Sequence, residues 1–181
     1  MSPAVSGVLS DLDRVLLDSV AIQARVAAMA AAIEKDFAGQ MLTVIIIMDG
    51  ALFFVADLLR AIGLPLRIVS VSASSYHGGT KSTGAVRLPW PPDMDLQGRH
   101  VLLLDDILDT GLTLGAVHDR LRKERVASLK TGVLLKKRRV QAREVPLDYI
   151  GFEIEDEFVV GYGMDYQGWF RNLPCIGILK L

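Results

Sequence analysis

The stretch that decides the fold is VLLLDDILDTGLTLGAV, residues 101–117. Four apolar residues lead directly into Asp105 and Asp106, and Asp109 follows three positions later. Thr110-Gly111-Leu112-Thr113 comes next, before an amphipathic segment. This order predicts a buried strand that ends in acidic residues, a tight turn and the start of a helix.

The rest of the chain alternates between the same two kinds of element. Helices are expected over residues 19–37, 112–124 and, after a turn, within 49–63, where Gly63 would close the helix. Strands are expected over 41–48, 66–74, 100–107, 126–137, 149–154 and 158–163. Such alternation predicts an α/β fold with a mainly parallel twisted sheet flanked by helices, and ligands beyond the carboxyl ends of its strands.

Composition limits the class of protein. The 181 residues are 51% hydrophobic and 23% charged, as in an ordinary globular domain, and the net charge is −1. The balanced charge gives no general attraction to nucleic acid or to an anionic membrane. The single cysteine, Cys175, excludes an internal disulfide and fits a reducing compartment. With no secretory signal pattern and no apolar run long enough to cross a bilayer, we expect a cytoplasmic protein.

The turn after the strand has the composition of a phosphate site. Gly111 permits a tight turn with inward-pointing amides, two threonine hydroxyls flank it, and the helix N-terminus follows. A plainer interpretation is a solvated loop in which Thr110 or Thr113 caps the helix. Carboxylates beside a phosphate can also accept hydrogen bonds from ribose hydroxyls or bind Mg²⁺. The chemistry therefore favours a phosphorylated sugar.

Five segments, which follow the family's order along the chain, resemble the hypoxanthine-guanine enzymes of the type I phosphoribosyltransferase family. VLLLDDILDTGLT resembles the signature that binds phosphoribosyl pyrophosphate, and IIIMDGALFFVADLL, SSYHGGTKSTG, and LLKK with FVVGYGMDYQGWFRNLP resemble further family segments. The resemblance covers roughly residue 41 to the C-terminus. It implies a single domain over residues 1–181. Residues 1–40 would supply the N-terminal helix and part of a small hood, residues 41–140 the core sheet, and residues 141–181 the base-binding part of the hood.

The same resemblance implies roles in binding phosphoribosyl pyrophosphate. Asp105 and Asp106 would hold the ribose hydroxyls, and Asp109, Thr110, Gly111, Leu112 and Thr113 would bind the 5′-phosphate. Asp109 would also be the catalytic acid/base at N7 of the purine. Met48, Asp49, Gly50 and Arg171 would bind pyrophosphate, with a cis peptide in the loop, and Asp105, Asp106 and Asp165 would contact Mg²⁺. Asp49 and Ala51 depart from the family's usual pattern.

Other positions would bind the purine or close the site. Ile107, Lys137, Phe158, Val159 and Asp165 would contact the base, with Phe158 stacked on it and Lys137 donating to its exocyclic oxygen. Ser75 and Tyr76 would belong to a lid within the glycine-rich residues 74–86, which would keep water from the reaction.

The implied activity is purine salvage. The enzyme would transfer the phosphoribosyl group from phosphoribosyl pyrophosphate to hypoxanthine or guanine, giving IMP or GMP and pyrophosphate. The expected partners are these two substrates and further copies of the chain in a homodimer or homotetramer. Neither nucleic acid nor membrane is expected as a partner.

Two alternatives remain at this point. The basic stretch KKRRVQAR, residues 136–143, would suit a nucleotide-sensing regulator with the same fold that binds nucleic acid, although no aromatic residues interleave it. The segment VLSDLDRVLLDS, residues 8–19, resembles the nucleophile motif of haloacid-dehalogenase phosphatases through Asp11 and Asp13. Arg14-Val15 replaces the usual Gly-Thr, however, and the segment is interpreted as the approach to a helix. A receiver domain would have no use for the Thr-Gly-Leu-Thr turn.

Overall fold

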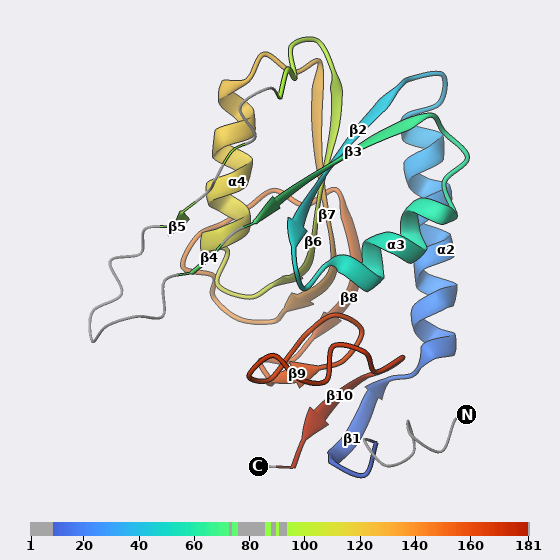
Figure 1. Cartoon of the computed structure of the whole chain (residues 1–181), viewed down its shortest axis with the longest axis vertical. Helices are drawn as coiled ribbons and strands as arrows, with labels where there is room; N and C mark the ends of the chain where they lie inside the picture. Colours follow the sequence, from blue (N-terminus) through green and yellow to red (C-terminus); the bar gives the residue numbers. More distant parts are fainter. Residues whose placement is uncertain (1–8, 73, 76–85, 88–89, 91–93, 181) are drawn as a thin grey trace.

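The computed structural model describes residues 9–72, 74–75, 86–87, 90 and 94–180. Five strands form a parallel sheet in the order β3-β2-β6-β7-β8 (Figure 1). They are β2 (Leu42–Met48), β3 (Leu66–Ser72), β6 (His100–Leu108), β7 (Ser128–Lys137) and β8 (Tyr149–Ile154). The predicted α/β class and parallel sheet are confirmed, with element ends that differ by a few residues.

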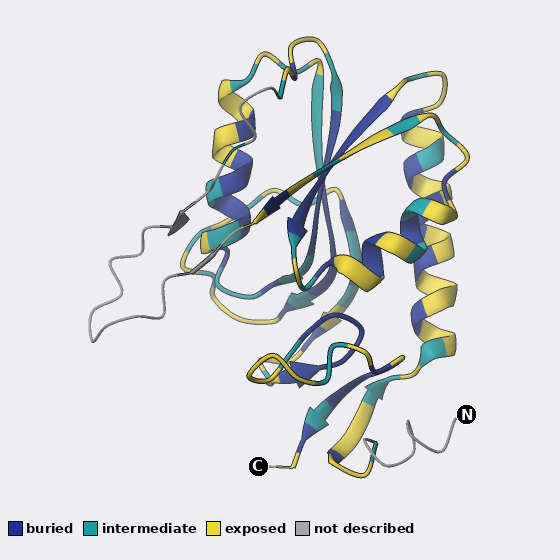
Figure 2. Cartoon of the chain, viewed as in Figure 1, coloured by how far each residue is buried: buried dark blue, intermediate teal, exposed yellow. Residues whose placement is uncertain are grey.

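Helices cover both faces of this sheet because its central strands are apolar on both sides. On one face, α2 (Ser19–Asp36) and α3 (Leu52–Arg60) pack on alternate residues such as Val44 and Ile46. On the other face, α4 (Leu112–Lys123) packs on Ile45 and Ile47. In Figure 2 the buried positions of the sheet and the inner stripes of the helices are dark blue.

Helix ends depend on local chemistry. The side chain of Asp18 caps α2 by accepting a 2.8 Å hydrogen bond from the amide of Ala21. The prediction that Gly63 closes α3 is wrong, because the helix already ends at Arg60 with Ala61 as its C-cap. None of the helices in the described part of the chain is long and apolar enough to span a bilayer.

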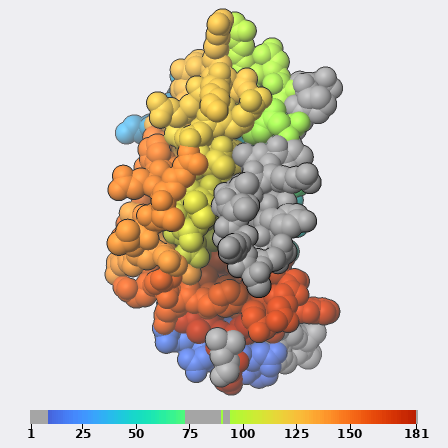
Figure 3. Space-filling view, turned by 90° about the vertical axis from the view of Figure 1, so that its left-hand side faces the viewer, coloured from blue at the N-terminus to red at the C-terminus, as the bar shows by residue number. Residues whose placement is uncertain are grey.

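A second, three-stranded antiparallel sheet is built from both ends of the chain. Its order is β1-β10-β9, with β1 (Leu12–Leu17), β10 (Ile176–Leu179) and β9 (Val159–Val160). We call this sheet and the turns between β9 and β10 the hood. It lies at the lower end of the molecule, blue and red in Figure 3, and confirms the predicted hood from the chain ends.

Two predictions about these end segments need correction. Residues 12–17 form a strand, not merely the approach to a helix, because they pair with residues 176–179 from the far end of the sequence. The core sheet also extends beyond residue 140, since β8 pairs in parallel with β7. The remaining pair, β4 (Ser74–Ser75) and β5 (Val86–Arg87), is antiparallel and separate from both sheets.

Candidate active site

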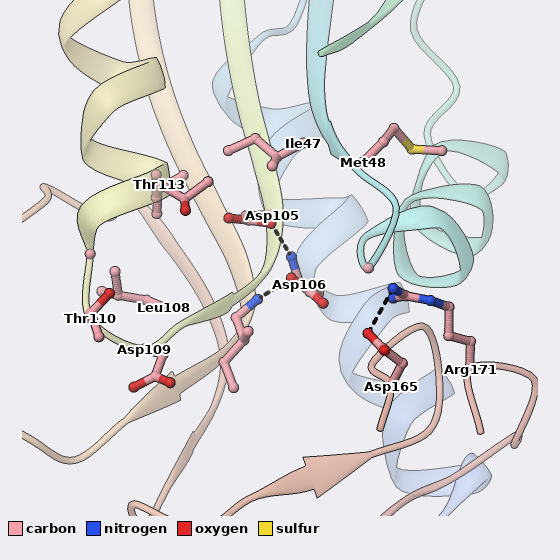
Figure 4. A pocket seen from close by; sticks show the side chains of 14 residues that line it. Ile47, Met48, Asp105, Asp106, Leu108, Asp109, Thr110, Thr113, Asp165 and Arg171 are labelled. Carbon is pink, nitrogen blue, oxygen red and sulfur yellow. Dashed lines mark hydrogen bonds and ion pairs between the residues drawn. The ribbon is translucent and has the colours of Figure 1, made fainter. Parts of the chain in front are cut away.

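Two adjacent carboxylates, those of Asp105 and Asp106, lie near the carboxyl end of β6 at the edge of the parallel sheet. Asp105 is buried, and its Oδ1 accepts a 3.0 Å hydrogen bond from the amide of Asp106. The Oδ1 of Asp106 accepts in turn from the amide of Ile107 at 2.9 Å. In Figure 4 Asp106 lies between Asp105 and the hood residues Asp165 and Arg171, and the carboxylate of Asp105 is turned toward Thr113. The cavity beside these residues is therefore walled by both parts of the molecule.

Burial makes it unfavourable for both carboxylates of this pair to be ionised at once. Desolvation, and then the negative charge of Asp106, raise the pKa of Asp105 well above its usual value. Desolvation also raises the pKa of Asp106, opposed in part by its hydrogen bonds and by the charge of Arg171. A cation or a set of hydroxyl donors in the cavity would relieve this cost.

The turn after β6 has a backbone that requires glycine. Gly111 has φ +79°, and a Cβ there would collide with the carbonyl of Arg143. The amide of Arg143 donates to the carbonyl of Thr110 at 3.1 Å, so the chain after β7 braces this turn. Gly111 itself is the N-cap of α4, and the hydroxyl of Thr110 accepts a 3.5 Å hydrogen bond from the amide of Leu112, the first residue of the helix.

The short loop after β2 lies beside the carboxylate pair. The Met48–Asp49 peptide is cis, as the resemblance implied. A Cβ on Gly50 would meet the carboxylate of Asp106, so glycine allows the loop to approach it. Asp49 is exposed and is not among the residues that line the cavity. The side chain of Asp49 therefore takes no part in the wall of this cavity.

Hood residues complete this first cavity. Arg171 makes a 2.7 Å ion pair with Asp165 and donates to the carbonyl of Gly163 at 2.6 Å. The other oxygen of Asp165 accepts from the amide of Gly168 at 2.7 Å. The cavity measures about 340 Å³, and its wall includes residues of all three segments: Met48, Gly50, Asp105, Asp106, Asp109, Thr110, Gly111, Thr113, Asp165 and Arg171.

A smaller cavity of about 190 Å³ adjoins the first and shares Asp106, Ile107, Asp109 and Asp165 with it. The wall is completed by Lys137 from the end of β7, by Phe158 directly before β9, and by Val159 and Met164 from the hood. Phe158 is half-exposed and contacts Tyr166 edge to face, with ring centroids 5.9 Å apart. The aromatic face of Phe158 is thus available to a planar ligand.

Charged side chains meet at the rim of this smaller cavity. The ammonium of Lys137, whose side chain is only 9% exposed, lies 3.3 Å from Asp109 and 3.3 Å from Asp156. Arg139 pairs with the same two carboxylates. Arg139, Asp156 and Met164 were not predicted as site residues. For Arg139 the available signal was the run of consecutive basic residues 136–139, but that run was interpreted only as a possible nucleic-acid surface.

The rest of the basic stretch is also neutralised within the chain. Lys136 pairs with Glu153, Arg138 pairs with Glu153 and Glu155, and Arg143 pairs with Asp119. Each cation of residues 136–143 therefore has an acidic partner. The positive charge that suggested a nucleic-acid surface is therefore offset by neighbouring carboxylates.

The remaining predicted residues have mixed outcomes. Ser75 belongs to β4, whose backbone pairs with β5, whereas Tyr76 lies outside the described residues, so the lid stays a prediction. Leu112 is the first residue of α4, and its side chain is exposed. Asp11 and Asp13 are exposed at the edge of the hood and line neither cavity, so nothing supports the phosphatase alternative.

The donor set of the larger cavity fits Mg²⁺ only in company with a ligand. Among the described residues, no three His, Cys, Asp or Glu side chains are grouped closely enough to hold a metal alone. Mg²⁺ is commonly bound by one or two carboxylates together with water and substrate phosphates. Asp105, Asp106 and Asp165, on the wall of one cavity, are suited to that mode.

Comparison with known proteins agrees with this geometry. Residues 15–167 match the family model of the phosphoribosyl transferase domain. A hypoxanthine-guanine phosphoribosyltransferase of Streptococcus pneumoniae is 39% identical over 171 residues, which cover 94% of this chain and 95% of the relative.

Solved structures extend the similarity to three dimensions. A hypoxanthine phosphoribosyltransferase of Staphylococcus aureus superposes with a TM-score of 0.90 at 39% identity, over 96% of this chain and 95% of that one. A hypoxanthine-guanine phosphoribosyltransferase of Bacillus anthracis gives 0.85 at 36% identity, over 93% and 99%. With the parallel sheet, the hood and the acidic strand end in place, the chain belongs to the phosphoribosyltransferase family.

Proposed function

We propose that this protein is a purine salvage enzyme. It transfers the 5-phosphoribosyl group from phosphoribosyl pyrophosphate to hypoxanthine or guanine, and the products are IMP or GMP and pyrophosphate. The names of the relatives support this choice of bases. The observation that carries the proposal is the pair of adjoining cavities, one acidic with a phosphate-type turn and one with an aromatic wall, joined at Asp106 and Asp109.

The larger cavity suits phosphoribosyl pyrophosphate. The turn of residues 109–113 would bind the 5′-phosphate through backbone amides and hydroxyls, because these donors stand at the N-terminus of α4. Asp105 and Asp106 would accept hydrogen bonds from the ribose hydroxyls. Gly50, Met48 and Arg171 would hold the pyrophosphate, for which the planar guanidinium offers paired donors.

The smaller cavity suits a 6-oxopurine. Phe158 and Ile107 would contact the two faces of the ring, and the backbone of Val159 and the side chain of Asp165 would lie near its edge. Lys137 would donate to the exocyclic oxygen. The ammonium is nearly buried, so an acceptor oxygen on the base would be recognised in a largely desolvated place.

The reaction forms a bond between a purine nitrogen and the anomeric carbon while the bond from that carbon to pyrophosphate breaks. Asp109, next to both cavities, would exchange the proton at N7. The charge of the departing pyrophosphate would be offset by Mg²⁺ held with the help of Asp105, Asp106 and Asp165. The chain otherwise contributes orientation of the two substrates and preformed donors for the phosphates.

The proposal extends to the setting of the enzyme. We place it in the cytoplasm, in keeping with its single, buried cysteine. We also infer a homodimer or homotetramer. An apolar cavity of about 590 Å³ between α3 and the β2–β3 side of the sheet has the exposed Leu52 and Ile68 in its wall, and it supports association through this apolar surface, which adjoins the active site at Met48.

A product assay with a matched variant tests the proposal. With phosphoribosyl pyrophosphate, Mg²⁺ and hypoxanthine, IMP and pyrophosphate should form in equal amounts, and Asp109→Ala should lower turnover about 100-fold because the proton carrier is gone. Chromatography of the nucleotide and a coupled pyrophosphate assay measure both products. Absence of IMP, and of GMP when guanine replaces hypoxanthine, would refute the proposed activity, whereas near-normal turnover of the variant would remove only the role of Asp109.

A further inference from the structure

Four charged side chains form a closed cluster at the rim of the smaller cavity. Lys137 and Arg139 extend from the end of β7 and the residues after it, Asp109 from the turn after β6, and Asp156 from the loop after β8. Each cation contacts both carboxylates, and each carboxylate contacts both cations. The four distances lie between 3.0 and 3.3 Å.

The contacts fix the orientation of the Asp109 carboxylate from two sides. The Oδ2 atom lies 3.3 Å from the ammonium of Lys137, and the Oδ1 atom accepts a 3.0 Å hydrogen bond from Nη1 of Arg139. The second contact is the shorter one, and it comes from a residue outside both cavity walls. Arg139 can therefore hold Asp109 without occupying the space of a ligand.

Asp156 anchors the arginine. Its two carboxylate oxygens both lie 3.3 Å from Nη1 of Arg139, and its Oδ1 also lies 3.3 Å from Lys137. Lys137 has three N–H donors, and two of them suffice for Asp109 and Asp156. One donor then remains for an acceptor in the cavity, while Arg139 keeps Asp109 in place.

We propose that Arg139 is a positioning residue that acts through Asp109, an inference that rests on the proposed function. Its guanidinium holds the carboxylate at the edge shared by the two cavities, where a proton leaves the base. Without Arg139, one oxygen of Asp109 would lose its partner, and the half-exposed side chain could rotate away from the base. The loss should appear in kcat more than in the KM of either substrate.

The chain offers a matched control one residue away. Arg138 also follows β7 and is also ion-paired, but its partners are Glu153 and Glu155, which line neither cavity. Arg138→Ala thus removes the same charge from the same loop without touching Asp109. Any effect of net charge or of loop stability should be common to both variants.

The experiment is a double-mutant cycle on initial rates with hypoxanthine and phosphoribosyl pyrophosphate. We expect Arg139→Ala to lower kcat about tenfold with less than about a twofold change in either KM, and Arg139→Lys to recover part of the loss. In the Asp109→Ala background, Arg139→Ala should have no further effect, because the group it positions is absent. Arg139→Gln, which keeps most of the side chain without its charge, should repeat the loss.

The outcomes separate this inference from the proposed function. An equal fold-loss for Arg139→Ala with and without Asp109, or an equal loss for Arg138→Ala, would overturn the positioning role while leaving the salvage activity intact. If the unmodified enzyme forms no IMP, the proposed function fails first. Thermal unfolding of each variant confirms that the rates compare folded proteins.

Discussion

At the scale of single residues, the site concentrates negative charge where solvent is scarce. Asp105 and Asp106 are adjacent at the end of a buried strand, and desolvation raises the pKa of each. A fold optimised only for stability would not place two carboxylates there. The arrangement is useful only when a ligand supplies hydroxyl donors or a cation, so the unfavourable charge prepares the site for binding.

The raised pKa gives a prediction about stability and pH. The carboxyl group of Asp105 binds its proton more tightly in the folded chain than in the unfolded chain. An Asp side chain in an unfolded chain has a pKa of about 3.9. The stabilising contribution is therefore complete below that pH and is lost as the pH rises through the folded pKa. Asp105→Asn, which can still accept from the amide of Asp106, should raise the midpoint of thermal unfolding in neutral and alkaline buffer.

The difference in unfolding midpoint between Asp105→Asn and the unmodified protein should shrink toward zero as the pH falls to about 4. Scanning calorimetry or circular dichroism over a range of pH, without Mg²⁺ or substrate, measures it. A difference that stays constant with pH would mean that the carboxylate charge is not responsible.

At the scale of secondary-structure elements, the unit of function is the β6–turn–α4 connection. Its strand, turn and helix were predictable because each has a local signal: an apolar run, a Thr-Gly turn and an amphipathic helix. The brace on that turn was not predictable. Arg143 reaches Gly111 only because β7 lies beside β6 in the sheet, and a side-by-side contact of this kind has no periodicity in the sequence.

Gly111→Ala tests the turn. A Cβ would both strain the left-handed backbone, at a cost of about 1–2 kcal/mol, and displace the carbonyl of Arg143. The KM for phosphoribosyl pyrophosphate should rise about tenfold or more, with a smaller change for the base, because the amides of the turn would move. Steady-state kinetics with each substrate varied in turn measure the two effects.

Gly98→Ala is the matched control for this substitution. Gly98 also has a positive φ, +68°, but no atom lies within 4 Å of the added Cβ. This variant should lose stability and keep its KM for phosphoribosyl pyrophosphate. Similar KM values for the two variants would show that contact with Arg143 is unimportant for the phosphate turn.

At the scale of the whole molecule, the hood joins the two ends of the chain at one end of the molecule, next to the parallel sheet. Strand β10 lies between β1 and β9, and β9 carries Val159 to the smaller cavity. β1 and β10 were missed in the sequence because β1 is a largely exposed edge strand and its partner lies more than 150 residues away. Their pairing depends on tertiary contacts that no local pattern reveals.

The packing of the hood predicts a clear difference between a buried and an exposed aliphatic side chain. Ile176 of β10 is fully buried in the core that also contains Val159, whereas Val140, after β7, is 94% exposed. Ile176→Ala should lower the free energy of unfolding by about 2–4 kcal/mol, and Val140→Ala by less than about 1 kcal/mol. Urea denaturation followed by circular dichroism measures both. Equal losses would mean that the hood does not share a core with the sheet.

The central claim concerns the base. An initial-rate assay with phosphoribosyl pyrophosphate, Mg²⁺ and each of hypoxanthine, guanine, xanthine and adenine tests it most directly. Rapid turnover of 6-oxopurines with little adenine activity is expected, because Lys137 can donate to a carbonyl oxygen but not to an amino group. Adenine turnover as fast as that of hypoxanthine would contradict the account, as would tight nucleotide binding without turnover of any base.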